Sequence, residues 1–237
     1  MSVPESNVKY WDVVPAAGVG KRMQADRPKQ YLMIDGRPLI ECAISQLIAE
    51  PHIEGVVVAI ADEDEYWPEL ELCLAKPLWV APGGVERCHS VLNALQELST
   101  HASDEDWVLV HDAARPCVRT EDIARLIAQL ADDPVGGLLA VPVRDTMKRA
   151  GSNQRVISTE TREGLWHALT PQMFRFGKLR HALEAAIEEE ALVTDEASAM
   201  ELAGNEPFLV EGHADNIKVT RPEDLDLATF YLQQQSN

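Results

Sequence analysis

Short apolar runs alternate with helical stripes along the first 143 residues of this chain. The runs have the length and character of buried strands, whereas the stripes repeat their apolar residues at helical spacing. The runs lie at residues 13–14, 55–61, 78–81, 107–110 and 136–143, and the stripes at 39–48, 91–98 and 120–130. This alternation predicts an α/β fold with a doubly wound, mainly parallel sheet, and the absence of a polar linker predicts a single domain, 1–237.

Composition and charge argue against a membrane protein, a secreted protein and a nucleic-acid-binding protein. No apolar stretch approaches the roughly 20 residues of a membrane span, and residues 1–10 lack the core of a signal peptide. We therefore expect a soluble protein of the cytoplasm that does not bind membranes. The net charge of −18 argues against nucleic acid as a partner, because such binding needs a basic surface. The four cysteines have irregular spacing, which indicates neither a zinc site nor disulfides, and we expect them to be buried or half-buried.

Residues 11–30 read WDVVPAAGVGKRMQADRPKQ and combine very small side chains with basic ones. The small residues after the first apolar run are Ala16, Ala17, Gly18 and Gly20. They allow the backbone to approach a ligand closely and to turn its N–H groups toward an anion. Three cations lie within nine residues of this acidic chain: Lys21, Arg22 and Lys29. The pattern predicts a phosphate-binding loop, and the alternative is an ordinary glycine-rich turn.

Two well-known phosphate motifs do not match this loop. A P-loop needs glycine at the position of Pro15 and serine or threonine at that of Arg22. A dinucleotide fingerprint needs a third glycine, and Met23 stands there. A nicotinamide-dependent oxidoreductase is therefore the least favoured function.

Two further turns follow later strands. Gly83 and Gly84 precede a helix whose first turns carry Arg87 and Ser90, a place where anions are received, although an ordinary helix start has the same pattern. The 107–110 run ends in HDAARP, residues 111–116, which places Asp112 where a carboxylate can hold a metal ion. The alternative role of Asp112 is a turn cap. Arg115 adds a donor fork of the size of a phosphate.

The regular alternation ends at residue 143. Residues 143–150 and 155–162, separated by turn residues, predict a β-hairpin arm at about 142–168. An isolated two-stranded arm is only marginally stable in water, so we expect it to pack on a second copy of the chain. The alternative is a flexible surface loop. Beyond the arm we expect three helices and one strand. The helices are one at 179–187, one that begins after Thr194 and Asp195, and one that begins at Thr220, and the strand is at 208–210. Residues 63–74 predict a short helix interrupted at Pro68.

Seven collinear segments together resemble one family. They read AAGVGKRM, PKQ, HDAARP, RDTMK, REGLWHAL, TDEASAMEL and ADNIKVTRPEDL, and they span nearly the whole chain. The chain is similar to the 2-C-methyl-D-erythritol 4-phosphate cytidylyltransferases, a Rossmann-like group of nucleotidyltransferases. The resemblance implies transfer of CMP from CTP to methylerythritol 4-phosphate with release of pyrophosphate. It also implies Mg²⁺ and a homodimer formed by exchange of the arms.

The resemblance implies roles for individual residues. Arg22 and Lys29 are implied to stabilise the charge that builds up on the α-phosphate. Lys218 and Arg162 are implied to hold the attacking phosphate, with Arg162 supplied by the arm of the partner subunit. Those implied to bind the nucleotide are Ala16, Ala17, Gly18, Lys21, Gly84, Arg87, Ser90 and Ala113. Weaker candidates for the substrate pocket are Thr146, Arg115, Thr170, Thr194 and Asp215, and Asp112 is implied to hold the metal.

One residue departs from the family pattern, and two alternatives remain open. Val85 follows the second glycine pair where a polar or acidic residue is expected, so contacts to the nucleotide there would be backbone only. A cytidylyltransferase for another polyol phosphate, such as ribitol 5-phosphate, would share the loop and metal residues. A non-catalytic CTP sensor on the same fold would have little need for Arg162 or Lys218.

Overall fold

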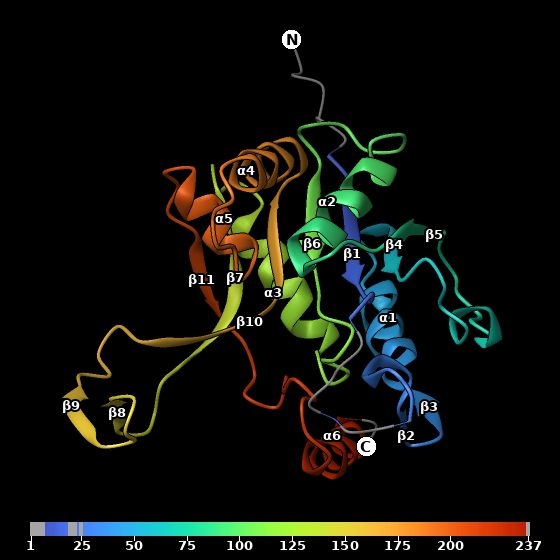
Figure 1. Cartoon of the computed structure of the whole chain (residues 1–237). Helices are drawn as coiled ribbons and strands as arrows, with labels where there is room; N and C mark the ends of the chain where they lie inside the picture. The colour runs from blue at the N-terminus through green and yellow to red at the C-terminus, as the bar shows by residue number, and fades with distance from the viewer. Residues whose placement is uncertain (1–7, 19–22, 24–25, 236–237) are drawn as a thin grey trace.

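The computed structural model describes residues 8–18, 23 and 26–235. Seven strands form one sheet in the order β11-β7-β10-β6-β1-β4-β5 (Figure 1). Their bounds are β1 Tyr10–Pro15, β4 Ile53–Ile60, β5 Leu78–Pro82, β6 Trp107–Val110, β7 Gly136–Pro142, β10 Trp166–Arg175 and β11 Phe208–Glu211. Neighbouring strands are parallel except at β10, which is antiparallel to both β6 and β7. The predicted fold class is confirmed.

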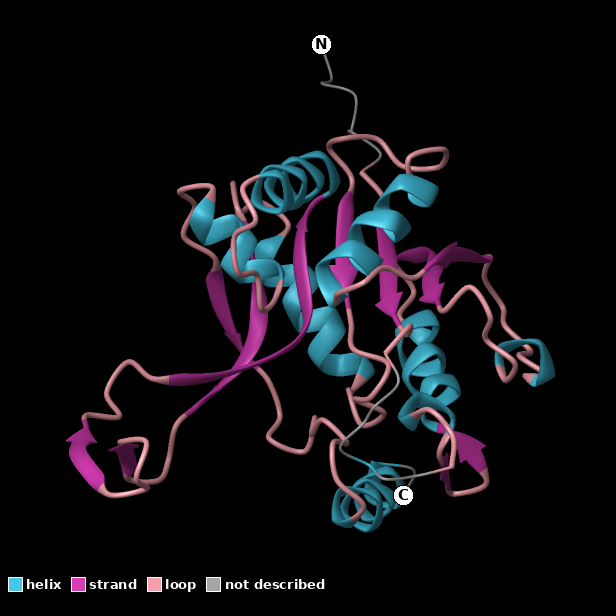
Figure 2. Cartoon of the chain, in the orientation of Figure 1, coloured by secondary structure: helices cyan, strands magenta, loops and turns pink. Residues whose placement is uncertain are grey.

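Helices cover both faces of this sheet (Figure 2). Their bounds are α1 Leu39–Ala49, α2 Arg87–Leu98, α3 Thr120–Leu130, α4 Phe176–Glu188, α5 Glu196–Leu202 and α6 Glu223–Gln235. The apolar faces of α1 and α3 pack on one side of the sheet, and those of α2, α4 and α5 pack on the other. Helix α6 packs at one end of this arrangement, against residues of α1 and of the short β2 Met33–Ile34, which pairs with β3 Arg37–Pro38.

The central strands show why the apolar runs do not alternate between apolar and polar residues. Val56 and Val58 of β4 join the core under α1 and α3, whereas Val57 and Ala59 join the core under α2. Successive side chains of a strand point to opposite faces, so a strand covered on both faces must be apolar throughout. The continuous apolar run at 55–61 is the consequence.

The long strand β10 and the two-residue strands β2 and β3 were missed, and one predicted helix is wrong. The sequence of β10 contains Pro171, which is typical of an edge or a non-strand, yet β10 lies near the centre of the sheet and its register shifts between Ala168 and Gln172. Residues 63–74 contain only a 3-10 turn, η3 Trp67–Glu69, instead of a helix. The side chains at 70, 72 and 74 are partly buried leucines with exposed residues between them, the period of extended chain.

The cysteine prediction is correct for three residues. Cys42, Cys88 and Cys117 are buried, and Cys73 is exposed because it lies on the outward side of the extended 70–74 segment. All four are free thiols. Within the described ranges, no helix combines the length and the apolar character that crossing a membrane requires.

The predicted hairpin is present as a separate two-stranded sheet, β8 Met147–Ala150 and β9 Val156–Glu160. It stands away from the body of the molecule at the ends of β7 and β10 (Figure 1). Val156 and Ile157 are 63% and 68% exposed, although β-branched apolar side chains usually contribute to a packed surface. An arm with these side chains in water has an apolar surface without a partner within the described chain.

Asp12 is a buried carboxyl group inside β1. Its neighbours in the register are Val56 and Leu109, it is 0% exposed, and neither carboxyl oxygen has a hydrogen-bond partner among the described residues. Burial raises the pKa of Asp12 well above its ordinary value, because the charged form cannot be solvated there. Nothing in the apolar run at 13–14 indicated this residue as a special site.

We expect Asp12→Val to stabilise the fold. A buried polar group without a partner costs about 1–3 kcal/mol, and valine suits a covered strand. A raised pKa means that the folded protein binds more protons than the unfolded one, so wild-type stability falls as pH rises above the unfolded pKa of about 3.9. The gain should therefore be larger at pH 8 than at pH 4 in urea unfolding, with exposed Asp26→Val as control. An equal gain at both pH values would contradict the raised pKa.

Candidate functional site

The candidate site lies where the strand order reverses. The chain runs from β1 to β4 and β5 on one side of β1, and β6 then lies on the other side of β1. In open α/β sheets, ligands bind beyond the carboxyl ends of strands at such a switch point. A cavity of about 510 Å³ is found there, within the range usual for small-molecule sites.

The cavity collects most of the residues that the sequence singled out. Segments after β1, β5 and β6, together with Lys29 and Lys218, form its wall. The predicted residues on the wall are Ala16, Ala17, Gly18, Lys29, Gly84, Arg87, Ser90, Asp112, Ala113 and Lys218. Lys21 and Arg22 lie outside the described residues. Val85 also lines the cavity and is 96% exposed, so it offers an apolar side chain where the resemblance led us to expect a polar or acidic one.

Backbone hydrogen bonds fix the first loop. The amide of Ala16 donates to the carbonyl of Ala59 at 2.7 Å, so the loop continues along β4 after β1 ends. The side-chain amide of buried Gln30 donates to the carbonyl of Ala16 at 2.6 Å. Gln30 belongs to the PKQ segment and the short 3-10 helix η2 Lys29–Tyr31, and it ties that segment, with Lys29, to the loop.

The second turn packs directly on the first. A Cβ atom on Gly83 would lie 2.2 Å from the Cβ of Ala17, so only glycine permits this approach. The amide of Gly84 donates to the Ser90 hydroxyl at 2.9 Å, and that hydroxyl donates to the carbonyl of Glu86 at 3.3 Å. Ser90 therefore braces the glycine turn from the first turns of α2.

Asp112 is surrounded by cations. Its carboxylate contacts Arg87 Nε at 3.0 Å, Arg115 Nε at 3.6 Å and Lys218 Nζ at 2.8 Å. Burial acts to raise the pKa of Asp112, but the charges of Arg87, Lys218 and Arg115 outweigh it and hold the pKa well below its usual range. Asp112 is thus ionised at any working pH, and it draws Lys218, from the loop after β11, toward the end of β6.

Arg87 links this cluster to a residue that the sequence analysis missed. Its guanidinium donates to both carboxylate oxygens of Glu196, at 2.6 and 3.0 Å, while its Nε donates to Asp112. Glu196 is 1% exposed and begins α5, directly after the N-cap residue Asp195, which forms a capping box with Ser198. Glu196 belongs to the TDEASAMEL segment, which was one of the segments that resemble the family. However, an acidic residue in the first turn of a helix is usually explained by its favourable interaction with the helix dipole.

A buried chain of hydrogen bonds positions Asp112 from behind. Its amide donates to the Thr170 hydroxyl at 3.1 Å, that hydroxyl lies 2.9 Å from His111 Nδ1, and His111 Nε2 lies 3.0 Å from the carbonyl of Arg115. A carbonyl only accepts, so Nε2 carries the proton and Nδ1 accepts from Thr170. Burial lowers the pKa of His111 to about 4, and the ring is neutral near pH 7. His111 thus has a structural position behind Asp112.

The remaining candidates are not among the residues that line the cavity, although Arg115 and Thr170 contact Asp112 from behind. Thr146 and Arg162 are exposed on or beside the arm, and Thr194 is exposed just before α5. Arg115 donates to the carbonyls of Asn216 and Ala168 besides its contact with Asp112. Asp215 accepts from Arg119 at 2.6 and 3.0 Å and from Gln235 at 3.3 Å. The substrate roles of Thr146, Arg115, Thr170, Thr194 and Asp215 stay predictions.

The residues present fit a hard divalent cation such as Mg²⁺. Asp112 offers an ionised carboxylate on the cavity wall, and Mg²⁺ in nucleotide sites is typically held by one or two carboxylates together with substrate phosphates and water. Its oxygens are shared with Arg87, Lys218 and Arg115, so a phosphate that attracts these cations would free an oxygen for the metal. Asp112 is therefore the residue that would hold the ion.

Comparisons with known proteins agree with this geometry. The family model for 2-C-methyl-D-erythritol 4-phosphate cytidylyltransferase matches residues 11–234. The enzyme of that name from Pseudomonas putida (strain GB-1) is 56% identical over 218 residues, covering 92% of this chain and 93% of that protein. The crystal structure of the Francisella tularensis enzyme of the same name has a TM-score of 0.82 at 36% identity and covers 94% of this chain and 99% of the other. The structure of the Thermus thermophilus enzyme has a TM-score of 0.78 at 28% identity and covers 95% of this chain and 100% of the other.

The family model covers residues 11–234, which include every segment that builds the cavity, and the relatives cover more than nine-tenths of the chain. This chain accordingly belongs to the 2-C-methyl-D-erythritol 4-phosphate cytidylyltransferase family.

Proposed function

We propose that this chain transfers CMP from CTP to 2-C-methyl-D-erythritol 4-phosphate and releases pyrophosphate. The observation that carries the proposal is the set of cations around one cavity in a strongly acidic protein. Four cations and three carboxylates lie on the cavity wall or contact residues on it. The cations are Lys29, Arg87, Arg115 and Lys218, and the carboxylates are Glu86, Asp112 and Glu196. A locally positive cavity in a chain of net charge −18 suits two phosphorylated reactants.

The chemistry needs alignment and charge neutralisation more than proton transfer. A phosphomonoester is ionised near neutral pH, so its oxygen can attack the α-phosphorus of CTP directly while pyrophosphate leaves. In this reading Lys29, together with Arg22, neutralises charge on the α-phosphate, and Lys218 moves from Asp112 to hold the attacking phosphate. A bound Mg²⁺ would supply further positive charge beside the phosphates. Neutral, buried His111 is not needed as a base.

We further propose that two copies of the chain complete each other's sites through the arm. The arm is a two-stranded sheet that stands away from the body, and such a sheet is marginal unless it packs on something. Its exposed apolar side chains, Val156 and Ile157, supply a surface for a second copy. The partner's Arg162 would then contact the substrate phosphate. CTP is an intracellular metabolite, and we propose the cytoplasm as the location.

Mixing two inactive variants tests this proposal. We expect Arg162→Ala and Lys218→Ala chains each to be nearly inactive, and their mixture to recover activity. In a mixed dimer one site keeps both residues and the other loses both. Random exchange gives half mixed dimers, so the mixture should reach about one quarter of the wild-type rate of pyrophosphate release.

Two results would contradict arm exchange. One is a monomer in sedimentation at working concentration. The other is no recovery although mass spectrometry shows mixed dimers. A mixture of Arg162→Ala with wild-type chain serves as control, because its activity should follow the number of intact sites. If the variants recover yet no pyrophosphate forms from CTP in preference to UTP, ATP or GTP, the assignment of the nucleotide is wrong while the dimer stands.

A further inference from the structure

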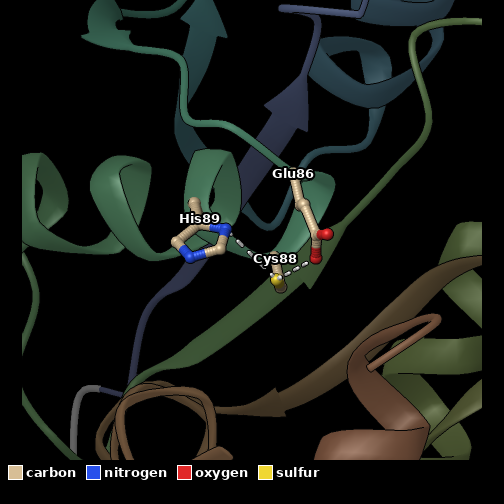
Figure 3. A group of neighbouring side chains, drawn as sticks. All are labelled: Glu86, Cys88 and His89. Carbon is tan, nitrogen blue, oxygen red and sulfur yellow. Dashed lines mark hydrogen bonds between the residues drawn. The ribbon is translucent and has the colours of Figure 1, made fainter. Parts of the chain in front are cut away.

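We propose that Glu86, Cys88 and His89 form a binding site for a borderline-soft divalent metal ion such as Zn²⁺. The three residues lie at the N-cap and in the first turn of α2, and their side chains point toward one another (Figure 3). Their ligand atoms all lie within 4.8 Å of one another. This group does not include Asp112, the proposed residue for the hard cation, although Glu86 lies on the wall of the same cavity.

The distances are close to those that one ion requires. Cys88 Sγ lies 3.6 Å from His89 Nδ1 and 3.9 Å from Glu86 Oε2. A tetrahedral zinc ion, with its usual bond lengths, sets sulfur about 3.5–3.7 Å from a nitrogen or oxygen ligand, and sets nitrogen about 3.3–3.5 Å from oxygen. Glu86 is exposed, so its carboxylate can move to close the gaps to Cys88, at 3.9 Å, and to His89, which lies within 4.8 Å. An ion therefore fits with little change in the backbone.

The donor set selects the type of metal. Thiolate and imidazole favour Zn²⁺ or Co²⁺ over Mg²⁺, which takes oxygen ligands. Binding would release the thiol proton of Cys88 and give two negative ligands beside one neutral ring. These two charges outweigh the unfavourable positive end of the α2 dipole, which is a small effect. The neighbouring Arg87 does not compete, because its guanidinium is directed to Glu196 and Asp112.

The three side chains are available for a metal. Cys88 lies at the edge of the core under α2, and its thiol is within hydrogen-bonding distance of both the Glu86 carboxylate and the His89 ring. Glu86 is exposed and His89 is half-buried. The spacing E-x-C-H is not a C-x-x-C pair or another common zinc motif, so the three-dimensional arrangement is what indicates a site. Three protein ligands leave a fourth tetrahedral position for water or another ligand, the pattern of an open site.

Cobalt spectroscopy of the full-length protein tests the site. We expect Co²⁺ titration without nucleotide to give one equivalent of bound ion, with a thiolate-to-metal absorption band and intense tetrahedral visible bands. One equivalent of Zn²⁺ should abolish these bands, and a large excess of Mg²⁺ should not. In Cys88→Ser the thiolate band should disappear, whereas Cys73→Ser, the matched change at the exposed cysteine, should leave it intact.

A second variant keeps the test decisive if Cys88→Ser does not fold. His89→Gln retains the thiol and should weaken Co²⁺ binding by more than about tenfold, since even changes outside the ligand shell cost that much. The absence of a thiolate band in the wild type would overturn the proposal. So would the same band and affinity in Cys88→Ser or in His89→Gln.

Discussion

Lys29→Ala is expected to lower the rate of pyrophosphate release by ~10² to 10³, which corresponds to ~3 to 4 kcal/mol of transition-state stabilisation. Lys29 lies on the cavity wall beside the first loop, and buried Gln30 fixes its segment to the carbonyl of Ala16. A cation placed in this way neutralises charge that grows during the reaction without having to reorganise. The loss should therefore appear mainly in kcat. Arg22→Ala, in the AAGVGKRM segment of the sequence, is expected to have an effect of similar size.

A lysine elsewhere provides the control for Lys29. Lys178 of α4 is exposed and donates to the carbonyl of Pro134 at 2.6 Å, so Lys178→Ala removes the same charge outside the cavity. This variant should keep turnover within a few-fold of wild type. Circular dichroism and the melting temperature should show that both variants are folded. If Lys29→Ala turns over as fast as Lys178→Ala, Lys29 has no role in neutralising the transition state.

The sequence predicted the cavity well because its parts follow simple rules. Small residues after the 13–14 run and the glycine pair at 83–84 permit a close approach to a ligand, and in the structure Gly83 packs directly on Ala17. Asp112 follows a buried strand in a parallel sheet, whose carboxyl end is a known ligand position. These inferences concern residues near strand ends, where topology determines position.

The missed features depend on contacts between distant parts of the chain. Glu196 meets Arg87 across 109 positions, and no spacing rule connects the two. Strand β10 contains Pro171, which a local reading assigns to an edge, although the sheet order places β10 between β6 and β7. Asp12 stands in an apolar run, where a single polar residue is easily taken for the exposed side of a strand. In each case tertiary packing overrides the local preference.

Glu196 shows how a residue outside the cavity can control its electrostatics. It binds both terminal nitrogens of Arg87, and the Nε of the same guanidinium donates to Asp112. Burial acts to lower the pKa of Arg87, but the charge of Glu196 and then that of Asp112 outweigh it, and the net pKa is raised. Glu196 itself is fixed from two sides. Asp195 caps its helix, and Gln172 of β10 contacts both Asp195 at 2.8 Å and the amide of Ala197 at 2.8 Å.

Glu196→Gln is therefore expected to destabilise the fold by about 3–5 kcal/mol, because removal of one partner leaves a buried charge poorly compensated. The exposed Glu201 of the same helix offers a matched control, and Glu201→Gln should change stability by no more than about 0.5 kcal/mol. Urea unfolding at neutral pH measures both values, and unchanged m-values would show that the unfolded states are comparable. A loss below about 1 kcal/mol would mean that desolvation offsets the attraction within the Arg87–Glu196 pair. In that case any decrease in turnover with normal stability would have to come from the orientation of Arg87 toward Asp112 alone.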